Sequence, residues 1–373
     1  MAPLSIPAGI APLAVRIKWE REMRLLGQDN NLPKNERRRA AVDRPTRSYM
    51  LDMIIMMVPL AVMAVVHYGA RALGIMVLSV LSAVVFEGVG YALMRRPAEL
   101  GDFSAVFTGL AIALVMPASV PLWMPVAGVA FAIIAVKLPF GSAPEALFVP
   151  AAAGIAFLTV CWGDLLFTYP AVGTDVVVTG SQAFVRGDSL AAMLRVGDSG
   201  APTMFNFFNI VSGGIAGPMG TTCTIALFGA AVYLLIRRPS QIIAPAAFVA
   251  VCSVCAVIFP RVLSGRKASL TMEIASGMLV FAALFFMSDP ATGPKKPLEK
   301  LIYGLAGGSL CMLLRYFGAY EEGACFAVLL MNAAWPPVSR AIFRRKKKAA
   351  DDKFPAARKN QPADVPEGGE VLS

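Results

Sequence analysis

The sequence predicts an all-α, polytopic integral membrane protein with about ten transmembrane helices, and three observations support this class. Hydrophobic residues make up 57% of the 373 residues and charged residues only 16%, whereas about a quarter of a soluble protein is normally charged. Apolar runs such as 50–68 and 269–287 are long enough to cross a hydrocarbon core. Basic residues cluster beside the ends of these runs, as at Arg95, Arg237 and Arg344. This distribution is typical of topology signals, so the net charge of +10 does not indicate nucleic-acid binding.

Residues 1–48 precede the first apolar run and form a basic segment that we expect in the cytoplasm. They lack a basic region followed by an apolar core, so we do not interpret them as a signal peptide. The stretch "VRIKWEREMRLL" places Val15, Trp19, Met23 and Leu26 on one helical face. Such a helix is expected either to lie on the membrane surface or to pack on a partner.

Ten hydrophobic passes are expected along the rest of the chain. They lie at about 49–68, 72–94, 103–116, 121–137, 146–163, 219–236, 242–259, 270–288, 301–317 and 323–339. If the chain starts inside, most Lys and Arg residues and both termini are cytoplasmic, and the long loop 164–218 is external. Two features fit this topology less well: 261–267 carries three basic residues on the outer side, and 103–116 is short for a simple span.

Proline-ended passes predict broken or half helices. The stretches "LVMP" (114–117) and "NAAWPP" (332–337) end apolar runs in this way, and such breaks often line a site near the middle of the membrane. Five passes on each side of a long loop also permit an inverted repeat, although no strong self-similarity is evident. We therefore expect a membrane domain over 49–345 and a disordered cytoplasmic tail over 346–373.

Cysteine and histidine content argues against a metal site. All six cysteines fall in or beside apolar runs, and the CxxC spacing at 252–255 supplies two of the four ligands that a structural zinc needs. Packing is therefore the preferred interpretation of these cysteines. His67 is the only histidine, which excludes a multi-histidine metal or haem site within the chain.

Three blocks give the chain a specific resemblance. They are "DFSAVFTGLAIALVMPASVPLWMPVAGVAFAIIAVKLPFG" (102–141), "SGMLVFAALFFMSDPATGP" (276–294) and "FGAYEEGACFAVLLMNAAWPP" (317–337). Together they resemble RnfD, a membrane subunit of the Rnf electron-transport complex, which is related to NqrB of the sodium-pumping NADH:quinone reductase. The resemblance runs in order from about residue 49 to 345.

This resemblance implies a subunit of a redox-driven translocase rather than a stand-alone enzyme. Rnf complexes sit in the bacterial inner membrane and move electrons between ferredoxin and NAD, coupled to Na+ or H+ translocation. The chain shows no P-loop, dinucleotide fingerprint or catalytic triad, so ferredoxin and NAD chemistry is expected on other Rnf-type subunits. Two alternatives on the same fold stay open: a flavin-free structural subunit, and a solute transporter or channel.

The resemblance also implies a covalent FMN, attached through a phosphoester to a Thr hydroxyl by a separate flavin transferase. The family's acceptor pattern reads Asp-Gly-x-Ser/Thr-x-Ala-Thr. Here Ser199, Gly200 and Ala201 match, Pro202 stands at the acceptor position, and Thr203 follows it. Thr203 is therefore the candidate attachment point and Ser199 a poorer one; otherwise this chain has lost its covalent flavin.

Other polar residues lie at the ends of expected passes or within them. Glu87 falls well inside the second pass, where an ionisable group is a functional candidate by default. We expect it to relay protons, bind sodium or pair with an arginine of a partner subunit. The remaining candidates are expected either to line a second, noncovalent flavin or an ion path, or to cap helices; they are Asp102, Thr108, Asp289, Thr292 and Asn332.

Overall fold

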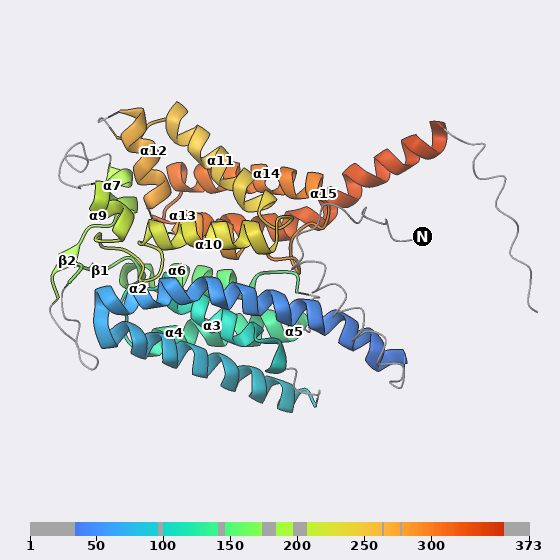
Figure 1. Cartoon of the computed structure of the whole chain (residues 1–373), viewed down its shortest axis with the longest axis horizontal. Helices are drawn as coiled ribbons and strands as arrows, with labels where there is room; N and C mark the ends of the chain where they lie inside the picture. The colour runs from blue at the N-terminus through green and yellow to red at the C-terminus, as the bar shows by residue number, and fades with distance from the viewer. Residues whose placement is uncertain are drawn as a thin grey trace, which may run out of the picture.

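The computed structural model describes a bundle of helices (Figure 1). The described residues are 34–95, 100–140, 146–173, 184–196, 207–262, 265–276 and 278–353. Ser199 and Thr203 lie outside them, as do the surface helix expected near Trp19 and residues 354–373.

Helix α2 (Lys34–Leu93) contains both of the first two expected passes. Its backbone leaves the helical region at Gly69, where φ is 61° and ψ is −149°. Glycine adopts this positive φ without the steric penalty of a Cβ atom. The chain therefore reverses at one residue, and the two limbs run back along each other (Figure 1). The segment Thr46–Leu93 is the one described helix that is long and apolar enough to cross a membrane by itself.

The rest of the first half consists of shorter elements. They are the 3₁₀ turn η1 (Leu100–Asp102), α3 (Ser104–Val115), α4 (Trp123–Ala130), the π-helical η2 (Phe131–Lys137), α5 (Leu138–Phe140) and α6 (Pro150–Leu166). Helix α3 spans 12 residues, about 18 Å at 1.5 Å per residue, roughly half of a hydrocarbon core. The amides of Met219 and Gly220 cap its end, donating to the carbonyls of Met116 (3.0 Å) and Leu114 (2.7 Å). The expected half helix at 103–116 is thus present and is closed by the loop that leads into the second half.

The connection between the halves forms one end of the bundle, which we call the loop end (Figure 1, left). Strands β1 (Tyr169–Pro170) and β2 (Arg186–Gly187) pair antiparallel there. The short helices α7 (Leu190–Val196) and α9 (Phe207–Ser212) follow. The opposite end, where α2 begins and α15 ends, is called the termini end.

The second half contains α10 (Thr224–Arg237), α11 (Ile243–Ile258), α12 (Arg266–Ala275), α13 (Met278–Phe285), α14 (Pro297–Phe317) and α15 (Ala324–Lys353). The pass expected at 270–288 is not one helix, because α12 and α13 are bent by 56° relative to each other. Taken together, this bent pair would be a second span by length and composition. Pro336 and Pro337 lie inside α15, so the half helix expected at 332–337 is wrong. An interior proline removes one amide donor and crowds the carbonyl four residues earlier, which membrane helices tolerate better than soluble ones.

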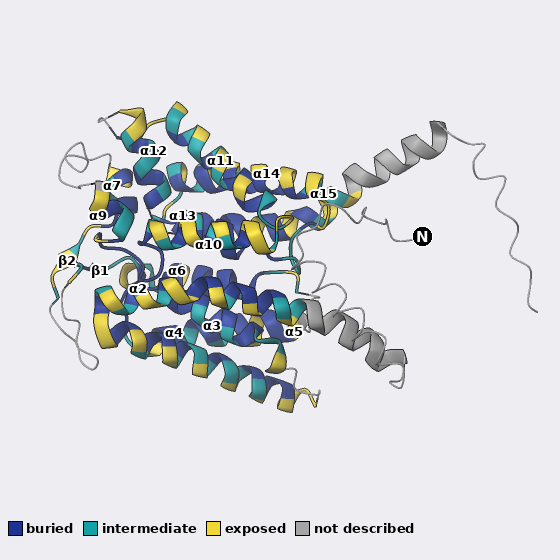
Figure 2. Ribbon diagram, viewed as in Figure 1, coloured by how far each residue is buried: buried dark blue, intermediate teal, exposed yellow. Residues whose placement is uncertain are grey.

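Apolar side chains occupy both the interior and much of the outer surface (Figure 2). Large side chains such as Phe281, Phe285 and Leu60 are completely buried. Val66 and Leu81, on the two limbs of α2, are more than half exposed. An apolar outer surface of this kind is what a lipid-facing helix presents. Helix α15 continues to Lys353, past residue 345, the expected end of the membrane domain.

Candidate functional site

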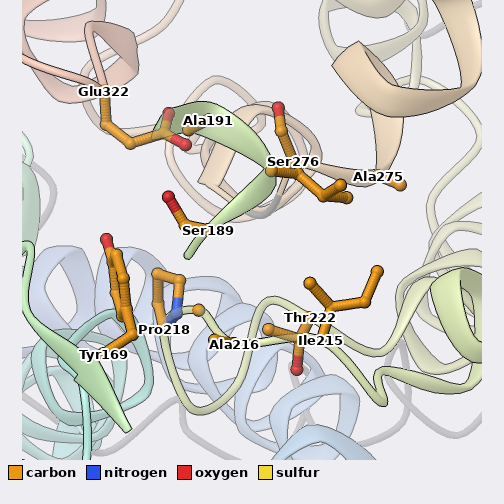
Figure 3. A pocket seen from close by; sticks show the side chains of 12 residues that line it. Tyr169, Ser189, Ala191, Ile215, Ala216, Pro218, Thr222, Ala275, Ser276 and Glu322 are labelled. Carbon is orange, nitrogen blue, oxygen red and sulfur yellow. The ribbon is translucent and has the colours of Figure 1, made fainter. Parts of the chain in front are cut away.

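A small pocket lies at the loop end, between the connection and the second half (Figure 3). Most of its lining is apolar, and we call it the polar pocket after the hydroxyl and carboxylate groups in its wall. Its volume is about 20 Å³, enough for one water molecule. The residues lining it come from β1, the start of α7, the segment after α9, the break between α12 and α13, and the turn before α15. The Glu322 carboxylate and the Ser189 hydroxyl point toward each other across it, beside the Tyr169 ring (Figure 3).

Two arginines and two glutamates form a buried network behind this pocket. Arg315 donates to Glu273 Oε2 at 2.9 Å and to Glu322 Oε1 at 3.4 Å. Arg261 donates to the other oxygen of Glu273. Glu273 is therefore held by two cations, whereas Glu322 has one distant contact. The second oxygen of Glu322, Oε2, is buried and has no hydrogen-bond partner among the described residues.

At the termini end, Glu87 contacts a lysine of the same chain. Lys137 Nζ lies 2.5 Å from Glu87 Oε1, and the two side chains are 2% and 0% exposed. Lys137 also donates to the Ser104 hydroxyl. Asp102 Oδ2 accepts from the Ser104 hydroxyl at 2.6 Å, and Asp102 Oδ1 accepts from its amide at 2.9 Å. Asp102 thus binds the first turn of α3 and connects, through Ser104, to the buried ion pair.

The remaining candidates from the second half also lie near the termini end. Asp289 accepts from the Ala291 amide at 3.0 Å and from the Thr292 hydroxyl at 3.4 Å, which is turn chemistry. Burial raises the pKa of the Asp289 carboxyl to about 6. Asn332 Oδ1 accepts from the Tyr303 hydroxyl at 2.5 Å. Its Nδ2 is buried without a hydrogen-bond partner in the described part of the chain.

Thr108, in contrast, has its hydrogen bond within its own helix. Its hydroxyl donates to the Ser104 carbonyl at 2.8 Å. The structure therefore brings Asp102, Ser104, Glu87 and Lys137 into one cluster and leaves Thr108 beside it.

A larger, apolar groove lies between α9, α10 and α12. Its volume is about 400 Å³, within the range of pockets that bind drug-sized or cofactor-sized ligands. Ile210, Ile225 and Ile274 are among its apolar walls, one from each helix. Thr224 also lines it, and its hydroxyl oxygen is buried with no hydrogen-bond partner among the described residues. Ala275 borders both this groove and the small polar pocket, so the two cavities lie on either side of the end of α12.

Lys137, Glu273, Arg315 and Glu322 are not among the residues selected from the sequence. Like Glu87, they are ionisable groups inside or at the edge of an apolar run. The two ends also share one arrangement: a basic side chain that donates to a carboxylate and to a serine at the start of a short apolar helix. The sets are Lys137, Glu87 and Ser104 at one end, and Arg315, Glu273 and Ser276 at the other.

Weak internal similarity accompanies this arrangement. "KLPFGSAPEALF" (137–148) and "RYFGAYEEGACF" (315–326) each run from the basic residue past a Phe-Gly pair to an acidic residue and a Phe. This is the sequence signal that could have identified the second set.

Comparison with known proteins gives a match over most of the chain. The model of the NQR2, RnfD, RnfE family matches residues 39–348. The chain belongs to this family. The subunit named D in the Na(+)-translocating ferredoxin:NAD(+) oxidoreductase complex of Acetobacterium woodii is 30% identical to it, over 79% of this chain and 88% of that protein. The proton-translocating counterpart from Clostridium ljungdahlii is 27% identical, over 80% of this chain and 90% of that protein.

Another relative is the corresponding subunit of the ion-translocating oxidoreductase complex of Yersinia enterocolitica, 28% identical over 79% of this chain and 92% of that protein. The expected resemblance to RnfD is thus confirmed, and with it a membrane subunit of an Rnf-type electron-transport complex. The names of the relatives include both Na+ and proton translocation.

Proposed function

We propose that this chain passes electrons through flavin within an Rnf-type complex and couples their flow to ion translocation. Membership of the family and the names of its relatives support the role of a complex subunit. Ferredoxin and NAD are then handled by other subunits, and a flavin transferase is the partner that modifies this chain.

The proposed topology has ten passes in an inverted repeat, with both termini in the cytoplasm and the loop end outside. Helix α2 begins and helix α15 ends on the same side of the bundle, opposite β1, β2, α7 and α9 (Figure 1). The matching sets around Lys137 and Arg315 at opposite ends support a repeat of opposite orientation. In this topology each of the two repeats contains one short helix, α3 in the first and α13 in the second. Each short helix would cross only one half of the membrane.

The apolar groove carries the flavin proposal. Residues 197–206, which include Thr203, connect α7 to α9, and α9 forms one wall of the groove. A tether at Thr203 would therefore hold FMN close to a cavity of suitable size and polarity. Phe208 is exposed on α9. There it could shield the isoalloxazine ring of FMN or anchor the chain at the membrane interface. Bound FMN supplies one- and two-electron transfer, and the groove residues would fix its position and exclude water.

For a second, noncovalent flavin, Asn332 is the strongest of the candidates. Its unpartnered Nδ2 is a donor that a flavin carbonyl would satisfy. Asp102, Thr108, Asp289 and Thr292 already have hydrogen bonds within the chain. We therefore propose Asn332 as a ligand, and for the other four the structural roles that their hydrogen bonds within the chain give them.

The closed end of α3 favours this redox role over a solute channel. The amides of Met219 and Gly220 occupy the carbonyls of Met116 and Leu114 at the end of α3, so these two carbonyls are not available to a passing solute.

The deciding experiment is co-expression of the full chain with a flavin transferase, followed by in-gel flavin fluorescence of the denatured protein. We expect a fluorescent band that is lost in Thr203→Val and kept in Ser199→Ala. A dark wild-type band would contradict the covalent flavin. Ile274→Trp should keep the fluorescent band but alter the visible spectrum of the native flavoprotein. Val254→Trp, at an exposed position of α11, is the matched control and should change neither.

A further inference from the structure

Glu322 is a buried carboxylate at the edge of a pocket, and one of its two oxygens makes no hydrogen bond with the described residues. Its side chain is 5% exposed, and Oε2 has no hydrogen-bond partner among the described residues although it borders the polar pocket. A buried carboxylate oxygen without a partner costs free energy unless a proton or a water molecule satisfies it. The pocket has room for one water.

A hydrogen-bonding route connects this pocket to the surface. The Ser189 hydroxyl, which faces Glu322 across the pocket (Figure 3), donates to Glu321 Oε2 at 3.0 Å. Glu321 is partly exposed. A water in the pocket would have the oxygens of Glu322, Ser189 and Tyr169 as neighbours, which meets the two to four polar partners that a buried water requires.

We propose that Glu322 is a proton-binding site, and that it exchanges its proton with the loop side through the pocket water, Ser189 and Glu321. The inference rests on the proposed ion translocation and names the ion that this site would take. A metal cation is disfavoured because Arg315 lies 3.4 Å from the same carboxylate and would repel it in a site of low dielectric. A proton instead neutralises the carboxylate and leaves Arg315 paired with Glu273.

The surroundings of Glu322 support titration near neutral pH. Burial raises the pKa of its carboxyl to about 7, although Arg315 acts in the opposite direction. The other titratable and charged groups that face it, taken over all the elements packed against it, are Glu273, Arg261, Glu321, Tyr169 and Cys325. Glu273 makes ion pairs with two arginines.

The direct test is pH-titrated infrared difference spectroscopy of the purified full chain. The parent chain carries Asp289→Asn, which removes the other buried carboxyl whose pKa is raised toward neutrality. In this parent we expect a protonated-carboxyl band that disappears as pH rises through about 7. Glu322→Gln should abolish it, whereas Asp164→Asn, at an exposed carboxylate, should leave it unchanged. Tyr169→Phe keeps the ring but removes a donor, so it should move the midpoint to higher pH. A band that persists in Glu322→Gln, or that Na+ removes at constant pH, would overturn the proposal.

A second measurement separates this site from the proposed function. In proteoliposomes containing the assembled complex, Glu322→Gln should keep electron transfer and lose most proton translocation per electron. Unchanged proton translocation would refute the role of Glu322 while leaving the redox function intact. A wild-type complex that translocates no ion would refute the proposed coupling, and the infrared titration would still decide whether Glu322 binds a proton.

Discussion

The buried pair of Glu87 and Lys137 gives the sharpest prediction about stability. The charged atoms are 2.5 Å apart and the side chains are 0% and 2% exposed, so neither group can be rehydrated if its partner is removed. Breaking such a pair costs about 3–5 kcal/mol, whereas replacing both members by apolar side chains of similar volume is often neutral. We therefore expect Lys137→Met to lower the free energy of unfolding by about 3–5 kcal/mol.

The double variant Glu87→Leu/Lys137→Met should recover most of this loss, with a coupling energy of about 3 kcal/mol between the two sites. The assay is unfolding of the purified chain in mixed micelles with increasing denaturing detergent, followed by helical circular dichroism. Asp52→Asn is the control. Asp52 pairs with Arg238 and Arg237, whose side chains are 25% and 44% exposed, so they can turn to water and the loss should be about 1 kcal/mol. Equal losses for Lys137→Met and Asp52→Asn, or additive single changes in the double variant, would refute the reasoning.

Two further predictions concern packing and pH. Gly304→Ala would place Cβ 2.3 Å from the Ala244 carbonyl oxygen, so it should lower the free energy of unfolding by about 1–3 kcal/mol; Gly229→Ala, which meets no atom within 4 Å, should raise it by up to about 1 kcal/mol in the same micelle assay. A loss of stability in both would contradict the helix-contact argument. The Asp289 carboxyl has its pKa raised from 3.8 to about 6, so the folded state binds this proton more tightly than the unfolded state and the associated stability, present below pH 3.8, is lost as pH rises to about 6. Asp289→Asn should remove this decline from the pH dependence of unfolding, and an unchanged slope would show that another group causes it.

The sequence was a good guide to where apolar helices lie, and a poor guide to where they break. The runs at 49–68 and 72–94 correspond to the two limbs of α2. In such long apolar runs, the favourable transfer of side chains to an apolar environment decides which residues form the helix. The break after α12 falls at a Ser-Gly pair, 276–277, a turn signal that is easily overlooked inside an apolar run. Tertiary contacts also hold it: Arg315 donates to Ser276 and to Glu273 just before it.

For the candidate site, sequence reasoning recognised Glu87 but not its partner. Lys137 is fifty residues away along the chain, and only the packing of η2 against α2 shows that the two meet. The sequence offered an arginine of another subunit as one possible partner; the structure has a lysine of the same chain instead. Pro336 misled the half-helix prediction: an interior proline usually kinks or breaks a helix, but α15 continues through it, as membrane helices tolerate.

The capping of α3 by Met219 and Gly220 has a consequence for biosynthesis. In the proposed ten-pass topology, a chain that extends only to the end of α6 lacks the Met219 and Gly220 amides that donate to the carbonyls of Leu114 and Met116. Water cannot replace these amides within a hydrocarbon core. The first half is therefore left incomplete until the chain just before α10 emerges. If the coding sequence were divided between residues 174 and 183, each fragment made alone should be degraded. When both fragments are made in the same cell, each should protect the other from degradation.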